Sequence, residues 1–214
     1  VAYSPNGKRI ALGCEEGMIK ILDASTGKET IATSGGRGMY NSMIMSLAFS
    51  PDSKRLVSGG MDQIIRIWDV TTGDELAALV GHKWKISTVA FDPKGERIIS
   101  ASGNGEIKVW DAHTDKDRKA IALKGHKAPV RDIVFSPDGK WLVSASFDKT
   151  LKIWDIAEGN EIRTLSGHEG PVWGVGIDSN GKRIVSGSGD KTVKIWDAAK
   201  GEELMTLHGH TGPI

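Results

Sequence analysis

Residues 126–155 read HKAPVRDIVFSPDGKWLVSASFDKTLKIWD, and residues 168–197 read HEGPVWGVGIDSNGKRIVSGSGDKTVKIWD. Both stretches contain short runs in which apolar and polar residues alternate, as is typical of strands with one buried face. Residues 136–139 are Ser-Pro-Asp-Gly, which favours a tight turn because proline presets φ and glycine accepts a left-handed backbone. The pattern predicts four strands here and just beyond, at 130–135, 141–145, 151–154 and 161–165.

This unit recurs along the chain. Its Trp-Asp pair occurs four times, at spacings of 42, 44 and 42 residues, and a Leu-Asp pair stands 46 residues before the first of them. A Gly-His pair recurs with a similar period. A period of this length indicates a repeat architecture. No long apolar stripe with a 3.6-residue period supports a helix, so the sequence predicts an all-β fold of similar four-stranded units.

These coupled motifs resemble the WD40 repeat family over the full length of the chain. The resemblance implies a WD40 β-propeller, in which each repeat forms a four-stranded antiparallel blade and the blades pack radially about a central channel. We therefore expect five consecutive blades in a single β-propeller segment spanning residues 1–214. Their approximate bounds are 1–38, 39–82, 83–126, 127–168 and 169–210, with 211–214 beginning a further repeat.

Both ends of the sequence are expected to fall inside a first strand. The chain begins with Val1 instead of methionine, and residues 210–214 align with residues 168–172. Five blades in an open arc would leave two apolar faces exposed. We therefore expect a fragment of a longer protein whose further blades complete a ring of about seven, or self-association of the segment.

The charge and cysteine content argue against several classes of protein. Lys and Arg number 28 against 27 Asp and Glu, for a formal net charge of +1 with both signs scattered along the chain. This balance gives no electrostatic reason to expect nucleic acid or a membrane as a partner. Cys14 is the only cysteine, so no internal disulfide can form, and a reducing, cytoplasmic location is expected.

Four residue types recur in register: His from the Gly-His pair, Ser in the second strand, Asp in the following turn and Trp in the third strand. Ser, His and Asp together also suggest a hydrolase. Catalysis needs one exposed nucleophile with an oxyanion hole, whereas this set recurs and always includes a Trp whose indole N–H needs an acceptor when buried. The family resemblance implies instead a buried hydrogen-bonded chain that ties each blade together.

Two predicted networks are complete and two are partial. The complete sets are His126, Ser144, Asp148, Trp154 and His168, Ser186, Asp190, Trp196; the partial sets are His82, Ser100, Asn104, Trp110 and Ser58, Asp62, Trp68. In the third unit Asn replaces Asp, which removes a charge-assisted bond, and the second unit lacks the His. The histidines stand one per unit without the short local spacing of a zinc site. We expect no catalytic residue, metal or cofactor.

The resemblance also implies a partner-binding face, which carries the loop before the first strand and the turn before the third strand of each blade. By position its candidate residues are Met45, Met61, Trp84, Arg131, Phe147 and Trp173. Aromatic, Met and Arg side chains are the usual anchors of protein interfaces. The alternative is that Trp84 and Trp173 pack over loop backbone and stabilise the fold.

Three functional hypotheses follow. The leading one is a non-catalytic protein–protein interaction scaffold, or the recognition domain of a larger multi-domain protein, that binds proteins or peptides on the propeller face. The alternative is the targeting or sensor region of an enzyme whose catalytic domain lies outside these residues. Nucleic-acid binding is disfavoured by the near-neutral charge and would require a steep loss of binding with added salt.

Overall fold

Every regular element in residues 1–34, 43–113 and 120–214, the part of the chain that the computed structural model describes, is a β-strand. The strands are β1 (Ala2–Tyr3), β2 (Arg9–Gly13), β3 (Met18–Asp23), β4 (Glu29–Ser34), β5 (Ile44–Phe49), β6 (Arg55–Gly60), β7 (Ile64–Asp69), β8 (Glu75–Val80), β9 (Ile86–Phe91), β10 (Arg97–Ser102), β11 (Ile107–Asp111), β12 (Ile121–Leu123), β13 (Val130–Phe135), β14 (Trp141–Ser146), β15 (Thr150–Asp155), β16 (Asn160–Ser166), β17 (Val172–Ile177), β18 (Arg183–Ser188), β19 (Val193–Asp197) and β20 (Glu203–Leu207). The same residues include no helix that is long and apolar enough to cross a membrane.

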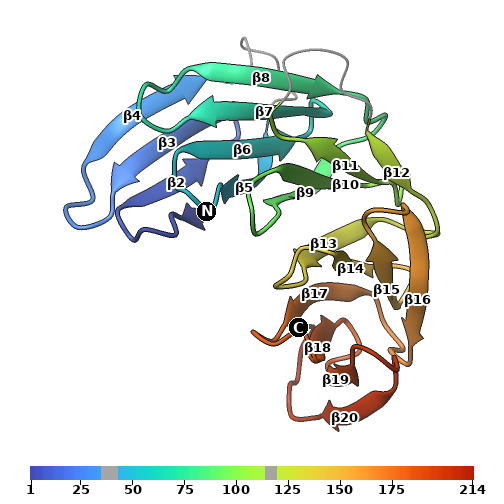
Figure 1. The fold of residues 1–214 in the computed structure, drawn as a ribbon. Coiled ribbons are helices and arrows are strands. Elements are labelled where there is room, and N and C mark those ends of the chain that lie inside the picture. Colours follow the sequence, from blue (N-terminus) through green and yellow to red (C-terminus); the bar gives the residue numbers. More distant parts are fainter. Residues whose placement is uncertain (35–42, 114–119) are drawn as a thin grey trace. The chain divides into compact units, whose positions relative to one another are not determined.

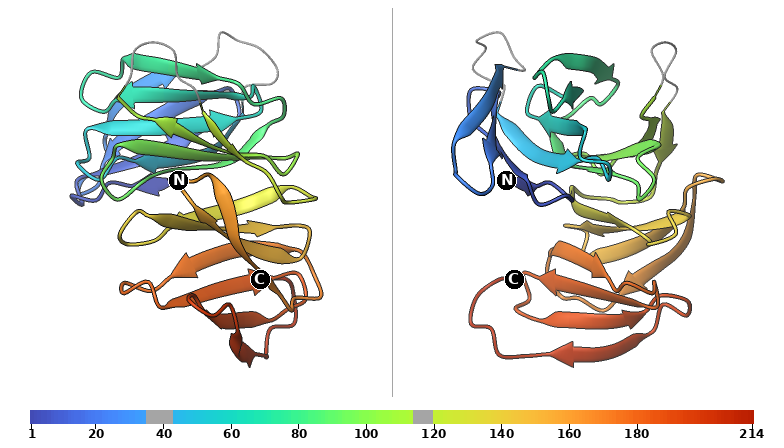
Figure 2. Two further views of the ribbon diagram at one scale, coloured as in Figure 1. Left: turned by 45° about the vertical axis from the view of Figure 1, so that its right-hand side comes forward. Right: turned by 60° about the vertical axis from the view of Figure 1, so that its left-hand side comes forward.

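The strands form five four-stranded sheets in the described residues, each a meander in chain order: β1–β4, β5–β8, β9–β12, β13–β16 and β17–β20 (Figure 1). We call these the first to the fifth sheet. Pairing is antiparallel throughout the fourth and fifth sheets, and the two further views in Figure 2 show the twist of the strands. The predicted all-β fold with five four-stranded units is confirmed.

The strands of the fourth sheet lie within one or two residues of their predicted ranges. The turn predicted at 136–139 joins β13 to β14, where the Gly139 N–H donates to the Ser136 carbonyl at 2.9 Å and Gly139 has φ of 69°. Ser136 Oγ accepts the Trp141 N–H at 3.2 Å and donates to Asp138 Oδ1 at 2.6 Å. The boundary predicted between the first two repeats, at 38–39, lies outside the described residues.

The chain divides into two compact units, one comprising Val1–Ser100 with Trp110–Ala120 and the other Ala101–Val109 with Ile121–Ile214. The first two sheets belong to the first unit and the last two to the second, while the strands of the third sheet are shared between them.

In the first unit the core forms where consecutive sheets pack face to face. Aliphatic side chains of β6, β7 and β8 meet β9, β10 and Trp110 in one cluster: Val57, Ile65, Ile67 and Leu79 pack with Ile86, Val89, Ile98 and Trp110. Each of these is at most 4% exposed. A second cluster joins β2 and β3 to Phe49, Leu56 and Trp68 of the second sheet.

The second unit repeats this arrangement between the fourth and fifth sheets. Its core contains Val143, Ala145, Leu151, Ile153 and Leu165 from the fourth sheet and Val172, Ile184 and Trp196 from the fifth. The aliphatic face of one sheet therefore packs on the tryptophan-bearing face of the next, which explains why both faces of these strands are apolar.

Candidate functional site: a buried polar network and an aromatic pair

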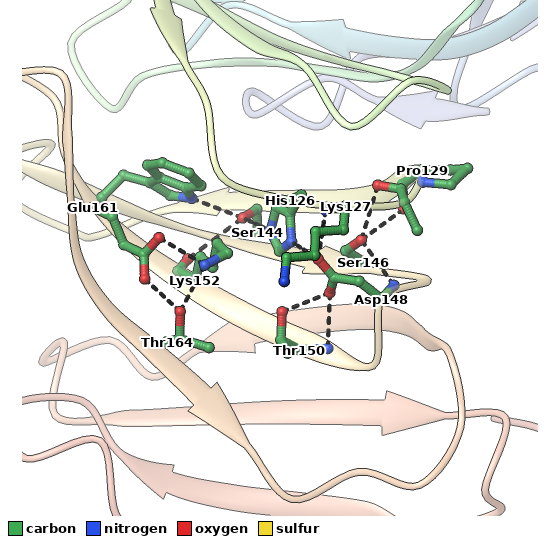
Figure 3. A network of polar contacts seen from close by, with 12 residues as sticks. His126, Lys127, Pro129, Ser144, Ser146, Asp148, Thr150, Lys152, Glu161 and Thr164 are labelled. Atoms are coloured by element: carbon green, nitrogen blue, oxygen red, sulfur yellow. Dashed lines mark hydrogen bonds and ion pairs between the residues drawn. The ribbon is translucent and has the colours of Figure 1, made fainter.

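The fourth sheet contains a complete network of polar contacts (Figure 3). His126 Nδ1 lies 2.7 Å from Asp148 Oδ2, and His126 Nε2 lies 2.7 Å from Ser144 Oγ. The Trp154 indole N–H donates to the same Ser144 oxygen at 2.8 Å. Two strands, β14 and β15, are thus linked to the turn between them and to the loop before β13 by one chain of side chains.

Asp148 is held in its charged form by several donors. Its carboxylate accepts hydrogen bonds from the Thr150 hydroxyl at 2.6 Å, from the Thr150 N–H at 3.0 Å and from the Lys127 N–H at 3.0 Å, in addition to the contact with His126. Burial alone would raise the pKa of Asp148, but these hydrogen bonds outweigh it and lower the pKa to about 2.

Burial acts in the opposite direction on the histidine. It lowers the pKa of His126 by more than the neighbouring Asp148 carboxylate raises it, so the ring is neutral at pH 7. We assign the proton to Nδ1, which donates to Asp148, because Nε2 then accepts the Ser144 O–H while Ser144 accepts the indole N–H. With this assignment the polar side-chain groups of His126, Ser144 and Trp154 all have hydrogen-bond partners.

The fifth sheet reproduces the network with the same geometry. His168 Nδ1 lies 2.7 Å from Asp190 Oδ2, His168 Nε2 lies 2.7 Å from Ser186 Oγ, and the Trp196 indole donates to Ser186 at 2.9 Å. Burial opposes ionisation of Asp190, but hydrogen bonds from Thr192, His168 and backbone N–H groups lower the pKa of Asp190.

The two partial networks depart from the complete ones in different ways: the third sheet has Asn104 in place of the acid, and the second sheet has the acid Asp62 but no histidine. In the third sheet, His82 Nε2 lies 2.7 Å from Ser100 Oγ and the Trp110 indole donates to Ser100 at 2.8 Å. Asn104 is exposed, and its side-chain carbonyl accepts the Glu106 N–H at 3.1 Å.

The second sheet keeps the tryptophan–serine bond and uses its acid differently. The Trp68 indole donates to Ser58 Oγ at 2.9 Å. Asp62, for which no histidine was predicted, forms an ion pair with Arg66 at 2.5 Å. Arg66 on β7 is thus the partner of the acid in this sheet, a contact that the repeat pattern did not predict.

The network residues are inaccessible as a hydrolase site. Ser144 has no exposed surface, and the His126 side chain is likewise 0% exposed. The serine oxygen already contacts the indole N–H and the imidazole, so an incoming carbonyl has neither a path nor a free direction of approach. In the described residues, no group of three or more His, Cys, Asp or Glu side chains is arranged to hold a metal ion.

A second type of polar cluster was missed from the sequence. Lys152 Nζ on β15 lies 2.7 Å from Glu161 Oε2 and 2.7 Å from Thr164 Oγ1, both on β16. Lys194, Glu203 and Thr206 make the same contacts in the fifth sheet. A lysine two residues before each of these tryptophans, with an acid on the next strand, was the available signal.

The candidate binding residues at first-strand positions lie on β-bulges. The register between first and second strands shifts at Ile44/Ser46, at Val130/Asp132 and at Val172/Gly174, and the extra residues are Met45, Arg131 and Trp173. A bulge re-aims a side chain out of the regular alternation of a strand. Arg131 and Trp173 are exposed and Met45 is half-buried.

Phe147 and Trp173 come together across the fourth and fifth sheets. Their ring centroids are 4.7 Å apart with an interplanar angle of 61°, an edge-to-face contact. A Cβ placed on Gly189 would fall 3.1 Å from the Trp173 indole nitrogen, so the missing side chain makes room for the ring over the turn. Trp173 packs on loop backbone, yet 39% of it remains exposed.

Two other candidates, Met61 and Trp84, belong to the first unit. They are 36% and 59% exposed, respectively. Among the six candidate residues of the predicted binding face, Phe147 and Trp173 are in ring contact.

Comparison with known proteins agrees with this architecture. The family model described as "WD domain, G-beta repeat" matches residues 30–69, 73–111, 118–155 and 159–197. No curated protein matches the chain. The four matched segments cover more than half of the sequence and end at the four Trp-Asp pairs. The chain therefore belongs to the WD40 repeat family.

Proposed function

We propose that this chain is a non-catalytic platform that binds other proteins or peptides through one end of its sheets. This end carries the loop before each first strand and the turn before each third strand, and we call it the loop end. WD40 repeats generally mediate protein–protein interaction or scaffolding. The observation that supports this role most directly is the Phe147–Trp173 pair, in which Trp173 is exposed and Phe147 is half-buried. Trp173 lies on β17 and Phe147 lies in the turn after β14, whereas Ser144 and His126, which resemble members of a catalytic triad, are buried and hydrogen-bonded.

An exposed tryptophan in contact with a second ring is well suited to anchor a partner. Aromatic side chains contribute a large contact area at low conformational-entropy cost, and they are enriched among the residues that carry binding energy. The bulge at Val172/Gly174 and the packing against Gly189 fix the indole before a partner arrives. A partner that covers it removes apolar surface from water without first ordering a flexible loop.

The test is affinity capture with the wild-type chain, Trp173→Ala and Ile162→Ala. Ile162 lies on β16 and is 50% exposed, so its substitution is a matched control for loss of an exposed apolar side chain. Proteins retained by the wild type and by Ile162→Ala are expected to be lost with Trp173→Ala. Equal capture by all three chains would contradict the proposal. A melting temperature within about 4 °C of wild type shows that Trp173→Ala leaves the fold intact.

We also propose that the outer face of the fifth sheet is covered in the functional assembly, by a further sheet or by a second copy. Val185 and Leu207 on this face are 42% and 45% exposed, whereas their equivalents in the fourth sheet, Val143 and Leu165, are at most 1% exposed. Ile214 lies against Gly187 on this face. These contrasts support a layer that covers the fifth sheet in the way that the fifth sheet covers the fourth.

A further inference from the structure

The loops around the aromatic pair carry an excess of exposed positive charge. Lys127, Arg131, Lys149 and Lys191 are all exposed in the segments 126–131, 147–150, 168–173 and 189–192. Glu169 is the one exposed acid in these segments, all of which the structure describes. The near-neutral net charge of the chain therefore conceals a locally basic surface.

Backbone contacts bring the segments that carry these cations close to the two rings. Phe147 donates its N–H to the Pro129 carbonyl at 2.9 Å, which places the turn containing Lys149 beside the loop that leads to Arg131. Gly189 lies under the Trp173 indole. The turn that contains Gly189 and Lys191 is therefore next to the ring. The Lys127 N–H is bound to Asp148, the residue after Phe147.

The carboxylates of the same loops are already used inside the protein. Asp148 and Asp190 each accept hydrogen bonds from a histidine, a threonine hydroxyl and backbone N–H groups. Asp132 is half-buried, and its Oδ2 accepts the Val175 N–H of the next sheet at 3.0 Å. These acids do not need the neighbouring lysines as partners, so the exposed cations remain available to a ligand.

The turns at the opposite end of the same two sheets differ in charge. Residues 136–140 and 178–182 each contain one aspartate and one lysine, and residues 155–160 contain two acids and no base. Exposed positive charge in excess is thus a property of the loop end, where the aromatic pair lies.

We infer that the surface formed by Phe147, Trp173 and the four surrounding cations accepts an acidic peptide segment that carries one large apolar side chain. This inference rests on the proposed function and adds the chemistry of the partner. The apolar side chain packs on the two rings, while flanking Asp or Glu residues lie near the cations and gain from charge complementarity. A basic segment would be repelled from the same surface.

The test is selection from a random-peptide display library on the wild-type chain. The expected products share a Leu, Ile, Phe or Trp flanked by acidic residues. The affinity of the strongest synthetic peptide is then measured for Trp173→Ala, for the double variant Lys127→Glu/Arg131→Glu, and for the control Lys140→Glu/Lys182→Glu at the opposite end. Glu169 occupies the position equivalent to Lys127 in the fifth sheet, so glutamate is compatible with the fold there.

Binding is expected to weaken by at least about tenfold in Trp173→Ala and in Lys127→Glu/Arg131→Glu, and to be unchanged in the control. If the selected peptides depend on Trp173 for binding but are neutral or basic, the inference of an acidic partner would be overturned. The proposed function would be unaffected. Absence of any Trp173-dependent peptide would overturn both. Equally tight binding of a single-stranded oligonucleotide, lost in the same double variant, would show that the basic surface recognises phosphate, and would also overturn the inference.

Discussion

At the scale of single residues, a histidine, a serine and an aspartate form one hydrogen-bonded network. Ser144 and His126 meet as a nucleophile and base would, but both are buried and Ser144 also accepts the Trp154 indole N–H. Buried networks of this kind are stable only when every member is paired, and removing one partner leaves the others unsatisfied.

Asp148 is therefore expected to contribute more to stability than Asn104. Asp148→Ala removes the acceptor for His126, Thr150 and the Lys127 N–H, so the free energy of unfolding should fall by about 1–3 kcal/mol. Asn104→Ala removes an exposed side chain with one backbone contact and should cost less. Urea denaturation of both variants measures the difference, and equal midpoints would contradict it.

The same aspartate makes stability depend on acid pH. The pKa of Asp148 is about 2 in the folded chain against an ordinary value of 3.8. A depressed folded pKa contributes stability that is fully present above about pH 4–5 and is lost as the pH falls toward 2. Urea titrations at pH 2.5, 4 and 6 are expected to show this loss, with a shallower decline in Asp148→Asn. Identical pH profiles would mean that the carboxylate has no such role.

At the scale of elements, the sequence was informative about strands and turns and silent about bulges. The alternation of residues and the Ser-Pro-Asp-Gly turn located β13 to β16 within one or two residues, because both are local properties of the chain. The bulges at Met45, Arg131 and Trp173 depend on how one strand pairs with the next. The contact of Phe147 with Trp173 depends on packing between sheets and was likewise predicted only as proximity on one face.

Packing between neighbouring sheets predicts a sharp difference between two strand glycines. A Cβ on Gly59 would lie 2.6 Å from Ile86 Cγ2 and 2.9 Å from Val89 Cγ1, whereas a Cβ on Gly174 would approach nothing closer than 3.8 Å. Gly59→Ala should destabilise the chain by about 1–3 kcal/mol, and Gly174→Ala by less than about 0.5 kcal/mol. Thermal denaturation of the two variants tests this; a neutral Gly59→Ala would show that the sheets are less closely packed.

At the scale of the whole molecule, the repeat predicted five similar sheets, and the expectation of two exposed apolar faces came from the open arc of blades and not from the local sequence of any strand. A face becomes core only when another sheet lies on it, and the local sequence is apolar in either case. Val185 on β18 therefore resembles the fully buried Val143 of β14 in sequence and differs from it in exposure. Ile195 on β19 pairs with Val185 on β18 and with Met205 on β20, so the three residues lie side by side across these strands. Met205 is 53% exposed.

This exposed face is expected to cause self-association of the isolated chain. Sedimentation velocity over a range of concentrations should show species larger than a monomer, because contiguous apolar surface is removed from water on association. Val185→Lys/Met205→Glu should shift the distribution toward monomer, while Ile162→Lys on β16 should not. A wild-type chain that sediments as a monomer at all concentrations would contradict the proposal.

The most direct measurement for the binding role is fluorine NMR of the chain labelled with 5-fluorotryptophan and titrated with the library-selected peptide. The seven tryptophan signals are assigned with single Trp→Phe variants. The Trp173 resonance is expected to shift with increasing peptide, while those of the buried Trp68, Trp110, Trp154 and Trp196 stay in place. A titration that moves the buried signals and leaves Trp173 unchanged would contradict a binding surface centred on the Phe147–Trp173 pair.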